Sequence, residues 1–263
     1  MHTARNRVYQ ENVVRTVVKR QGAVLLSLAL AACGVPAPKP PAAPRAAPAA
    51  PAAPGPAAPA GKTPGHTAPA AGTRYRIDPT QSELRVLVYR AGPMASLGHN
   101  HVVSTRSLQG WAVFDGDPTA AAFALTAPVG DFVVDDPTLR AEEGADFAEE
   151  VGGEARSGTL HNMLGPEVLN AANFSALKIT SVSVSAGAGR LRARVALEVA
   201  GHASTVVVPF VLEVSPRRLA ASGELSLSQS SIGLTPLSVF LGALKVRDEL
   251  EVKFKFVAVA GGA

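Results

Sequence analysis

An alternation of apolar and polar residues over residues 190–214 constrains the fold of this chain more than any other feature. The first run has apolar residues at every second position: Leu191, Ala193, Val195, Leu197 and Val199. The second run repeats the pattern at Val206, Val208, Phe210, Leu212 and Val214. A period of two is typical of a β-strand with one face in an apolar interior. With a short turn at residues 200–204, the two runs predict an antiparallel hairpin.

Other apolar, β-prone runs are separated by Gly, Pro, Asp or Ser. They cover residues 84–89, 108–114, 122–129, 177–184, 219–228 and 245–259. Together with the hairpin they predict about eight strands, mostly without the helical segments that a parallel sheet requires. The expected fold class is therefore all-β, with an antiparallel sheet.

Residues 136–170 interrupt the strands with a helical insertion. Asp136 and Pro137 offer a helix cap and a first-turn proline, and Gly152-Gly153 ends the first segment. A second short helix is predicted over residues 154–164, whose apolar residues have helical spacing and should pack on the sheet. The acidic run over residues 142–154 is expected to be a solvated helix face.

The charge of the chain is unevenly distributed. Residues 73–263 carry seventeen Lys and Arg against twenty Asp and Glu, a net charge of −3, so the high isoelectric point comes from the N-terminal segments. Nucleic-acid binding is excluded because it needs a basic face on the folded domain.

The N-terminal segment is typical of a bacterial export signal. Arg15, Lys19 and Arg20 precede an apolar run at residues 22–32, which is too short to span a bilayer. The run ends in Leu30-Ala31-Ala32-Cys33, which resembles a lipoprotein lipobox. Residues 1–33 are therefore expected to be a signal peptide, with Cys33 lipidated and holding the protein on a membrane.

This anchor predicts a place in the bacterial cell envelope, facing the periplasm. Gly34 stands where an Asp would favour retention in the inner membrane, so the outer membrane is the expected site.

Residues 34–72 contain 27 Ala or Pro among 39 residues. Such a composition cannot build a core and favours extended conformers. We expect a disordered linker that connects the anchor to a folded domain at residues 73–263.

Several motifs of the folded domain resemble the YceI-like family of bacterial envelope proteins, described as polyisoprenoid-binding. The matching residues are Tyr75-Arg76-Ile77-Asp78-Pro79 with Ser82, then Arg156, Val168-Leu169-Asn170-Ala171 and Phe174, then Gly201 with Val206-Val207-Val208-Pro209, then Ile232-Gly233, and finally Val246 with Asp248-Glu249-Leu250. The motifs follow the family's order.

The resemblance implies an eight-stranded, lipocalin-like antiparallel barrel that holds a long isoprenoid chain. Candidate ligand-lining residues are the inward Val195, Leu197, Val206 and Val208, together with Trp111. A barrel of this size either is filled by side chains or holds one small ligand, so a solid core is the alternative.

The segment Leu97-Gly98-His99-Asn100-His101 suggests chemistry of its own. His99 and His101 point the same way on an extended segment, and His161 or His202 could complete a three-His site for a divalent metal. The alternatives are that the two His bind a polar ligand head at the barrel mouth or stabilise a local turn.

No nucleophile elbow, dinucleotide fingerprint or zinc-protease motif is present in the sequence. We therefore expect a binding protein and not an enzyme, with no required cofactor, an apolar lipid as its ligand and a membrane as its support. A metal-binding protein and a ligand-free adaptor domain are the alternative functions, and the oligomeric state stays open.

Overall fold

The computed structural model describes residues 72–187 and 189–261. The predicted signal peptide, Cys33 and nearly all of the predicted linker lie outside the described residues.

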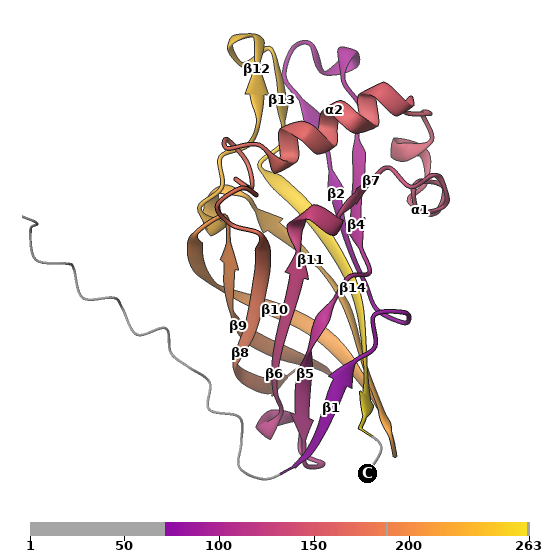
Figure 1. Cartoon of the computed structure of the whole chain (residues 1–263), viewed down its shortest axis with the longest axis vertical. Helices are drawn as coiled ribbons and strands as arrows, with labels where there is room; N and C mark the ends of the chain where they lie inside the picture. The colour runs from indigo at the N-terminus through magenta and orange to yellow at the C-terminus, as the bar shows by residue number, and fades with distance from the viewer. Residues whose placement is uncertain (1–71, 188, 262–263) are drawn as a thin grey trace, which may run out of the picture. The chain divides into compact units, whose positions relative to one another are not determined.

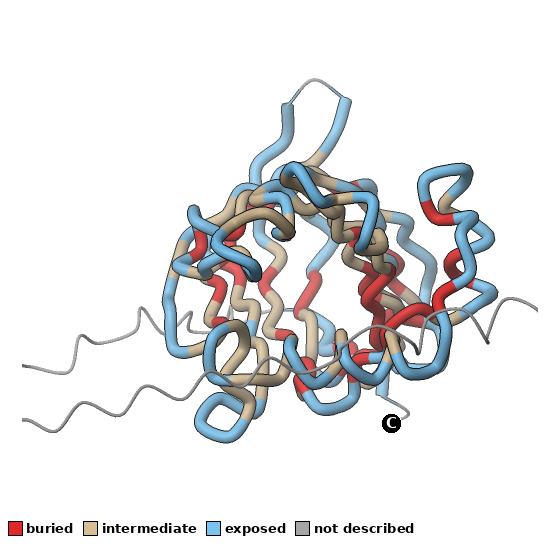
Figure 2. The backbone as a smooth tube through the Cα atoms, turned by 90° about the horizontal axis from the view of Figure 1, so that it is seen from above, coloured by how far each residue is buried: buried red, intermediate tan, exposed pale blue. Residues whose placement is uncertain are grey.

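The core of the domain is a ring of eight antiparallel strands (Figure 1). In ring order they are β1 (Thr73–Ile77), β5 (Gln109–Phe114), β6 (Ala122–Pro128), β8 (Ala176–Gly187), β9 (Arg190–Val199), β10 (His202–Ser215), β11 (Arg218–Ser228) and β14 (Glu249–Ala260). The ring closes because β14 pairs with β1, Tyr75 lying opposite Ala260. The expected all-β barrel is confirmed, and Figure 2 shows the ring from one end.

Short strands extend one wall of the barrel upward. The segments β2 (Glu83–Val88), β4 (His101–Thr105) and β7 (Val133–Val134) follow one another beside β14. A separate small sheet consists of β12 (Ser238–Val239), β13 (Leu244–Val246) and β3 (Arg90–Ala91). It projects beyond the end of the barrel that lies farthest from the start of β1 (Figure 1).

The strands β1 and β2 are one wall strand with a break in it. Both pair with β14, and the chain bulges away from it at residues 79–82, after Asp78 N has donated to Val257 O at 2.8 Å. Ser82, which is fully buried, repairs the gap: its Oγ accepts a hydrogen bond from Val257 N at 2.9 Å and donates to Asp78 O at 2.7 Å. A side chain thus replaces the missing backbone partner of β14.

The two helices lie at different places: α1 (Pro137–Glu142) packs on the outer face of β2 and β4 through Leu139, whereas α2 (Gly153–Leu164) lies at the end of the barrel (Figure 1). The first helix is capped as predicted, since Asp136 Oδ1 accepts from Thr138 N and Leu139 N. The second helix crosses the barrel end (Figure 1). Its Leu160, Met163 and Leu164 pack on the core, as expected from their spacing.

Six single turns of 3-10 helix complete the described elements. They are η1 (Ala95–Leu97), η2 (Pro118–Ala120), η3 (Val129–Asp131), η4 (Ala145–Phe147), η5 (Ser230–Ile232) and η6 (Phe240–Gly242). None of the described helices is long and apolar enough to cross a membrane.

The hairpin of residues 190–214 forms with a shorter turn than expected. Only Ala200 and Gly201 separate β9 from β10, with φ values of 48° and 81°. A two-residue turn needs two successive left-handed residues to match the twist of the flanking strands, and Ala200 and Gly201 supply them. The inward alternation holds through Leu212, but Val214 is 52% exposed at the strand end.

Pro209 marks a seam in the barrel wall. β10 pairs with β9 from His202 to Phe210, whereas its pairing with β11 begins only at Val211. Proline cannot donate a ladder hydrogen bond, so β10 and β11 part at this residue. Gly223 packs directly on the Pro209 carbonyl, where a Cβ atom would lie only 2.4 Å from the oxygen.

Three other expectations are corrected. The run at residues 245–259 is two strands, because β13 belongs to the small sheet and β14 to the barrel. The strands β1 and β4 were not predicted. The acidic run is not wholly solvated, since the side chain of Glu143 is 3% exposed and binds both Arg85 and Lys253.

We predict that Ser82→Ala lowers the free energy of unfolding by about 1–3 kcal/mol, because Val257 N is then buried without a partner. Urea unfolding of the variant and the parent protein measures the change. Ser231→Ala removes a comparable but exposed hydrogen bond to Ser228 O and serves as the control. Equal stability of the two variants would show that Ser82 does not hold the wall closed.

Candidate functional site

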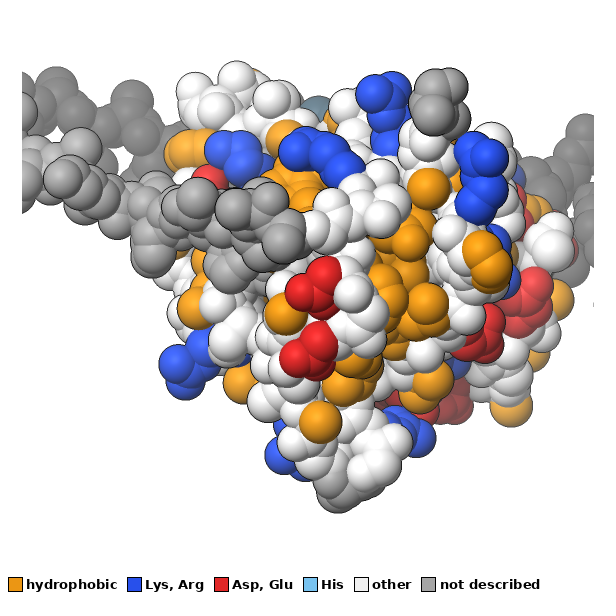
Figure 3. Space-filling model, turned by 90° about the horizontal axis from the view of Figure 1, so that it is seen from below, with side chains coloured by type: hydrophobic (Ala, Val, Ile, Leu, Met, Phe, Trp, Pro, Cys, Tyr) orange, Lys and Arg blue, Asp and Glu red, His pale blue; other side chains and the backbone are white. Residues whose placement is uncertain are grey.

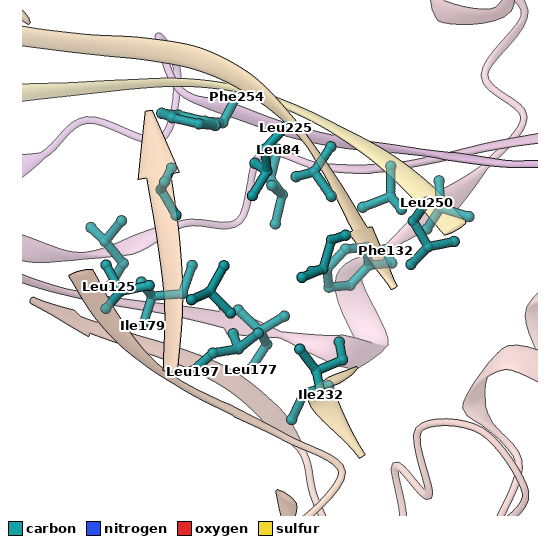
Figure 4. A pocket seen from close by; sticks show the side chains of 18 of the residues that line it. Leu84, Leu125, Phe132, Leu177, Ile179, Leu197, Leu225, Ile232, Leu250 and Phe254 are labelled. Carbon is teal, nitrogen blue, oxygen red and sulfur yellow. The ribbon is translucent and has the colours of Figure 1, made fainter. Parts of the chain in front are cut away.

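The barrel encloses an apolar cavity of about 490 Å³. Every strand of the ring contributes apolar side chains to its wall, and α2 contributes Met163 from the end of the barrel. Figure 4 shows side chains of opposite walls that face a common space, with Leu84, Leu225 and Phe254 on one side and Leu125, Ile179 and Leu197 on the other.

The alternation of small and medium side chains keeps this space open. The inner faces of β9 and β10 present Val195, Leu197, Val206 and Val208, all of which line the cavity. Their short side chains do not reach across the ring. Seen from the end where β1 begins, hydrophobic side chains also gather in the middle of the face (Figure 3).

Trp111 does not line the cavity. The next three residues of β5, Ala112, Val113 and Phe114, line it, and Trp111 lies outside its wall. There the guanidinium of Arg74 lies 4.7 Å from the ring centroid, a cation–π contact. Trp111 therefore lies on the barrel surface and not in the cavity wall.

Polar side chains line the cavity only at the end covered by α2 and the small sheet. They are Tyr89, Arg90, His99, His101, Thr159, Asn162, Gln229 and Lys245. The cavity therefore has one polar end and a long apolar body.

A buried carboxylate organises this polar end. Asp135 is 1% exposed, and its Oδ1 accepts hydrogen bonds from Val102 N at 2.9 Å and Arg140 Nη1 at 2.6 Å. Its Oδ2 lies 2.7 Å from Nδ1 of His101. Arg140 also donates to the carbonyl oxygens of Asn100 and Glu149, so one ion pair ties three loops together.

The environment keeps Asp135 ionised. Burial alone raises the pKa of its carboxyl, but the hydrogen bonds from His101, Val102 N and Arg140 outweigh burial and leave the pKa below its ordinary value. An ionised acceptor at Nδ1 makes that nitrogen the donor, so Nε2 of a neutral His101 is an acceptor. Thr159 Oγ1 lies 3.4 Å from this Nε2, at the cavity surface.

Two further polar side chains lie at this end of the barrel. His99 Nδ1 is buried and has no hydrogen-bond partner; Glu149 Oε1 lies 3.4 Å away without the geometry of a bond. Tyr89 donates its hydroxyl to Glu251, and burial, followed by this hydrogen bond, raises the pKa of Tyr89 to about 12. Its phenol therefore stays neutral at physiological pH.

The structure does not assemble the predicted three-His metal site. Within residues 72–187 and 189–261 there is no group of three His, Cys, Asp or Glu residues that could hold a metal. His161 is exposed on α2, and the ring of His202 packs on Gly233. His99 and His101 are neighbours, with ring centroids 6.2 Å apart, but Nδ1 of His101 is already hydrogen-bonded to Asp135.

Sequence reasoning missed Asp135, Arg140 and Thr159 as members of the site. Asp135 directly precedes the helix cap Asp136, and nothing in the sequence shows that one of these two acids is buried while the other caps α1. Only the pairing of β4 with β7 brings Asp135 beside Val102.

No protein-family model matches the sequence, and no curated protein matches it in sequence. Among solved structures, the crystal structure of Burkholderia cenocepacia BcnA has a TM-score of 0.51 and 16% identity, and it covers 70% of this chain and 99% of that chain. The fold is that of BcnA. This finding agrees with the barrel that the YceI-like motifs implied.

Two other solved structures are more distant. A polyisoprenoid binding domain from Saccharophagus degradans, implicated in plant cell wall breakdown, has a TM-score of 0.47 and 12% identity and covers 71% of this chain and 98% of that chain. A Campylobacter jejuni YCEI protein has a TM-score of 0.40 and 12% identity and covers 57% and 81% of the two chains.

We predict that Asp135→Asn destabilises the protein by about 3 kcal/mol at neutral pH, because Arg140 keeps its charge in a buried site without an anion. The folded-state pKa of Asp135 lies below its ordinary value of 3.8. Its carboxylate therefore stabilises the fold above that value, and the stabilisation is lost as pH falls through the lowered pKa.

Urea unfolding from about pH 7 to about pH 3 tests both parts of this prediction. The variant should lose less stability on acidification than the parent protein. Glu167→Gln, at an exposed position, is the matched control and should keep the parent's pH dependence. An Asp135→Asn protein with the parent's stability and pH slope would remove Asp135 from its organising role.

Proposed function

We propose that this protein binds a long apolar lipid of the polyisoprenoid kind inside its barrel and stores or carries it without a chemical step. The observation that carries the proposal is the open apolar cavity. The resemblance of the sequence motifs to the YceI-like family supplies the chemical class of the ligand.

A cavity of about 490 Å³ is costly for a small domain. Protein interiors are normally close-packed, and cavities left by core truncations cost about 24 cal/mol per Å³. That scale applies to closed, dry cavities, so for this partly open cavity a cost on the order of 10 kcal/mol is an upper limit. An apolar ligand removes this cost, which favours a ligand over an empty barrel.

The polar end suits the head of such a ligand. His101 and Thr159 line the cavity there, with Nε2 and Oγ1 3.4 Å apart. A hydroxyl or another small polar group there would exchange hydrogen bonds with these atoms while its chain lies along the apolar wall.

The alternative functions have less support. A metal site at His99 and His101 lacks the third ligand within the described part of the chain. An adaptor domain with a filled barrel would leave no volume of this size between the walls.

We predict that the double variant Val195→Phe with Val206→Phe weakens binding of a fluorescent polyprenyl lipid at least about tenfold. Val195 and Val206 are paired residues on β9 and β10, and both line the cavity, so two added rings would occupy the ligand's space. Fluorescence titration measures the affinity.

The matched control is Val207→Phe, which adds one ring to the outer face of the same strand, where Val207 is 53% exposed. It should bind as the parent does. Unchanged binding by a folded double variant would place the lipid outside the barrel and contradict the proposal.

We also propose that Cys33 carries the lipid anchor and holds the domain in the cell envelope, facing the periplasm. Cys33 is the single cysteine of the chain, and it follows a short apolar run with preceding cations.

In bacteria that express the protein, Cys33→Ser should abolish incorporation of labelled fatty acid and shift the protein from the membrane to the soluble fraction. The expectation follows because the acyl chains are the proposed anchor. Ser27→Ala, within the apolar run, is the control and should leave labelling intact. Acylation that persists in Cys33→Ser would refute the anchor.

A further inference from the structure

The small sheet that projects from the polar end of the barrel carries an unusual cluster of exposed apolar side chains. We define the apolar tip as five residues of its two loops: Met94, Leu97, Val239, Phe240 and Leu241, which are 37%, 66%, 39%, 70% and 109% exposed. They make up five of the eleven large exposed hydrophobic residues in the described part of the chain. Exposed apolar clusters of this kind mark interaction sites.

The backbone holds this cluster in place. Strand β13 pairs with both β12 and β3, and Met94 N donates to Ala243 O at 2.8 Å, so the two loops form one unit. Phe240 and Leu241 have φ values of 51° and 56°. Bulky residues rarely adopt this left-handed conformation. Both side chains are exposed, so burial of apolar surface does not offset its cost.

Three cations lie on the small sheet that carries the apolar tip. The small sheet and its loops, residues 90–97 and 238–247, contain Arg90, Lys245 and Arg247 and no Asp or Glu, whereas Asp248 and Glu249 follow directly. Lys245 and Arg247 are exposed, whereas Arg90 lies 3.3 Å from Glu149 of a neighbouring loop. Apolar side chains at an extremity with cations behind them suit a bilayer surface that contains anionic lipids.

The apolar tip is continuous with the cavity. Val239 of the tip itself lines the cavity, together with Leu244 and Lys245 of the same hairpin and Gly98 beside Leu97. A lipid that leaves a bilayer at the tip would therefore meet the polar end of the cavity first.

From these observations we infer that the apolar tip inserts into the surface of an anionic lipid bilayer and aligns the cavity mouth with it. A bilayer fits better than a protein partner, because five side chains on two protruding loops are a small footprint for a stable protein interface. The purpose of docking, lipid exchange, rests on the proposed function, but docking itself can be measured separately.

The test places one bimane fluorophore at the apolar tip through Leu241→Cys, in a full chain that carries Cys33→Ser so that the label is unique and no acyl anchor contributes. The control label is Val207→Cys, on the barrel wall, where Val207 is 53% exposed. Vesicles contain phosphatidylcholine with about one third phosphatidylglycerol and a lipid-attached nitroxide quencher.

We expect the nitroxide to quench the label at position 241 and not the label at position 207. Quenching should weaken in vesicles of phosphatidylcholine alone and at high salt, because the cations then lose their partners. A tip label that stays unquenched while the protein binds a polyprenyl lipid would overturn docking and leave the proposed function standing. Quenching of the tip label by a protein that binds no polyprenyl lipid would support docking and overturn the proposed function.

The double variant Phe240→Asn with Leu241→Asn removes the apolar surface while keeping residues that tolerate positive φ. In the Cys33→Ser chain it should lower affinity for the anionic vesicles about tenfold or more. Val211→Asn with Val214→Asn, at positions 49% and 52% exposed, is the control and should bind as the parent does. If Phe240→Asn with Leu241→Asn instead dissociates a dimer and leaves vesicle binding unchanged, the apolar tip is a self-association surface and the inference is wrong.

Discussion

Closure of the hydrogen-bonded ring between β14 and β1 is the constraint on which the rest of the structure depends. An antiparallel sheet with one apolar face must bury that face, and closing the ring does so without a second layer. Backbone pairing of β1 with β14 closes the ring, and where the chain bulges away from β14 after Asp78, Ser82 supplies the partner that Val257 N would lack. Once it is closed, the short side chains of the inner face leave the cavity open.

The two ends of the barrel then differ in chemistry. At the polar end, the ion pair between Asp135 and Arg140 fixes the segments around His101, since both side chains are bonded to backbone groups of neighbouring loops. Outside the wall, Glu143 lies between Arg85 and Lys253 and joins the end of α1 to β2 and β14. Burial acts to raise the pKa of Glu143, but these two cations hold it below its ordinary value. These charged contacts position α1 and the loops around His101, while apolar side chains form the body of the cavity.

The sequence predicts the barrel well because its strands carry strict alternation and its turns carry Gly, Pro or Asp. The inward direction of Val195, Leu197, Val206 and Val208 follows from that alternation alone, as does the packing of α2 from its helical spacing. The cavity itself does not follow, because alternation fixes which side chains face inward and leaves open whether they meet across the ring. The polar end was equally hidden, since Asp135 reaches His101 only through the pairing of β4 with β7. The third histidine ligand could not be predicted for the same reason: His161 and His202 share no local pattern with His99 and His101, and within the described residues no group of three metal ligands forms.

The central claim is that the barrel encloses an apolar lipid, and native mass spectrometry of the protein purified from bacterial membranes tests it most directly. A lipid-filled barrel should give a bound mass that survives gentle desolvation and passes into organic solvent as a lipid, at about one molecule per chain. A bare protein mass would contradict the claim if the same purification retains a polyprenyl lipid added beforehand, because the cavity would then be empty in the cell.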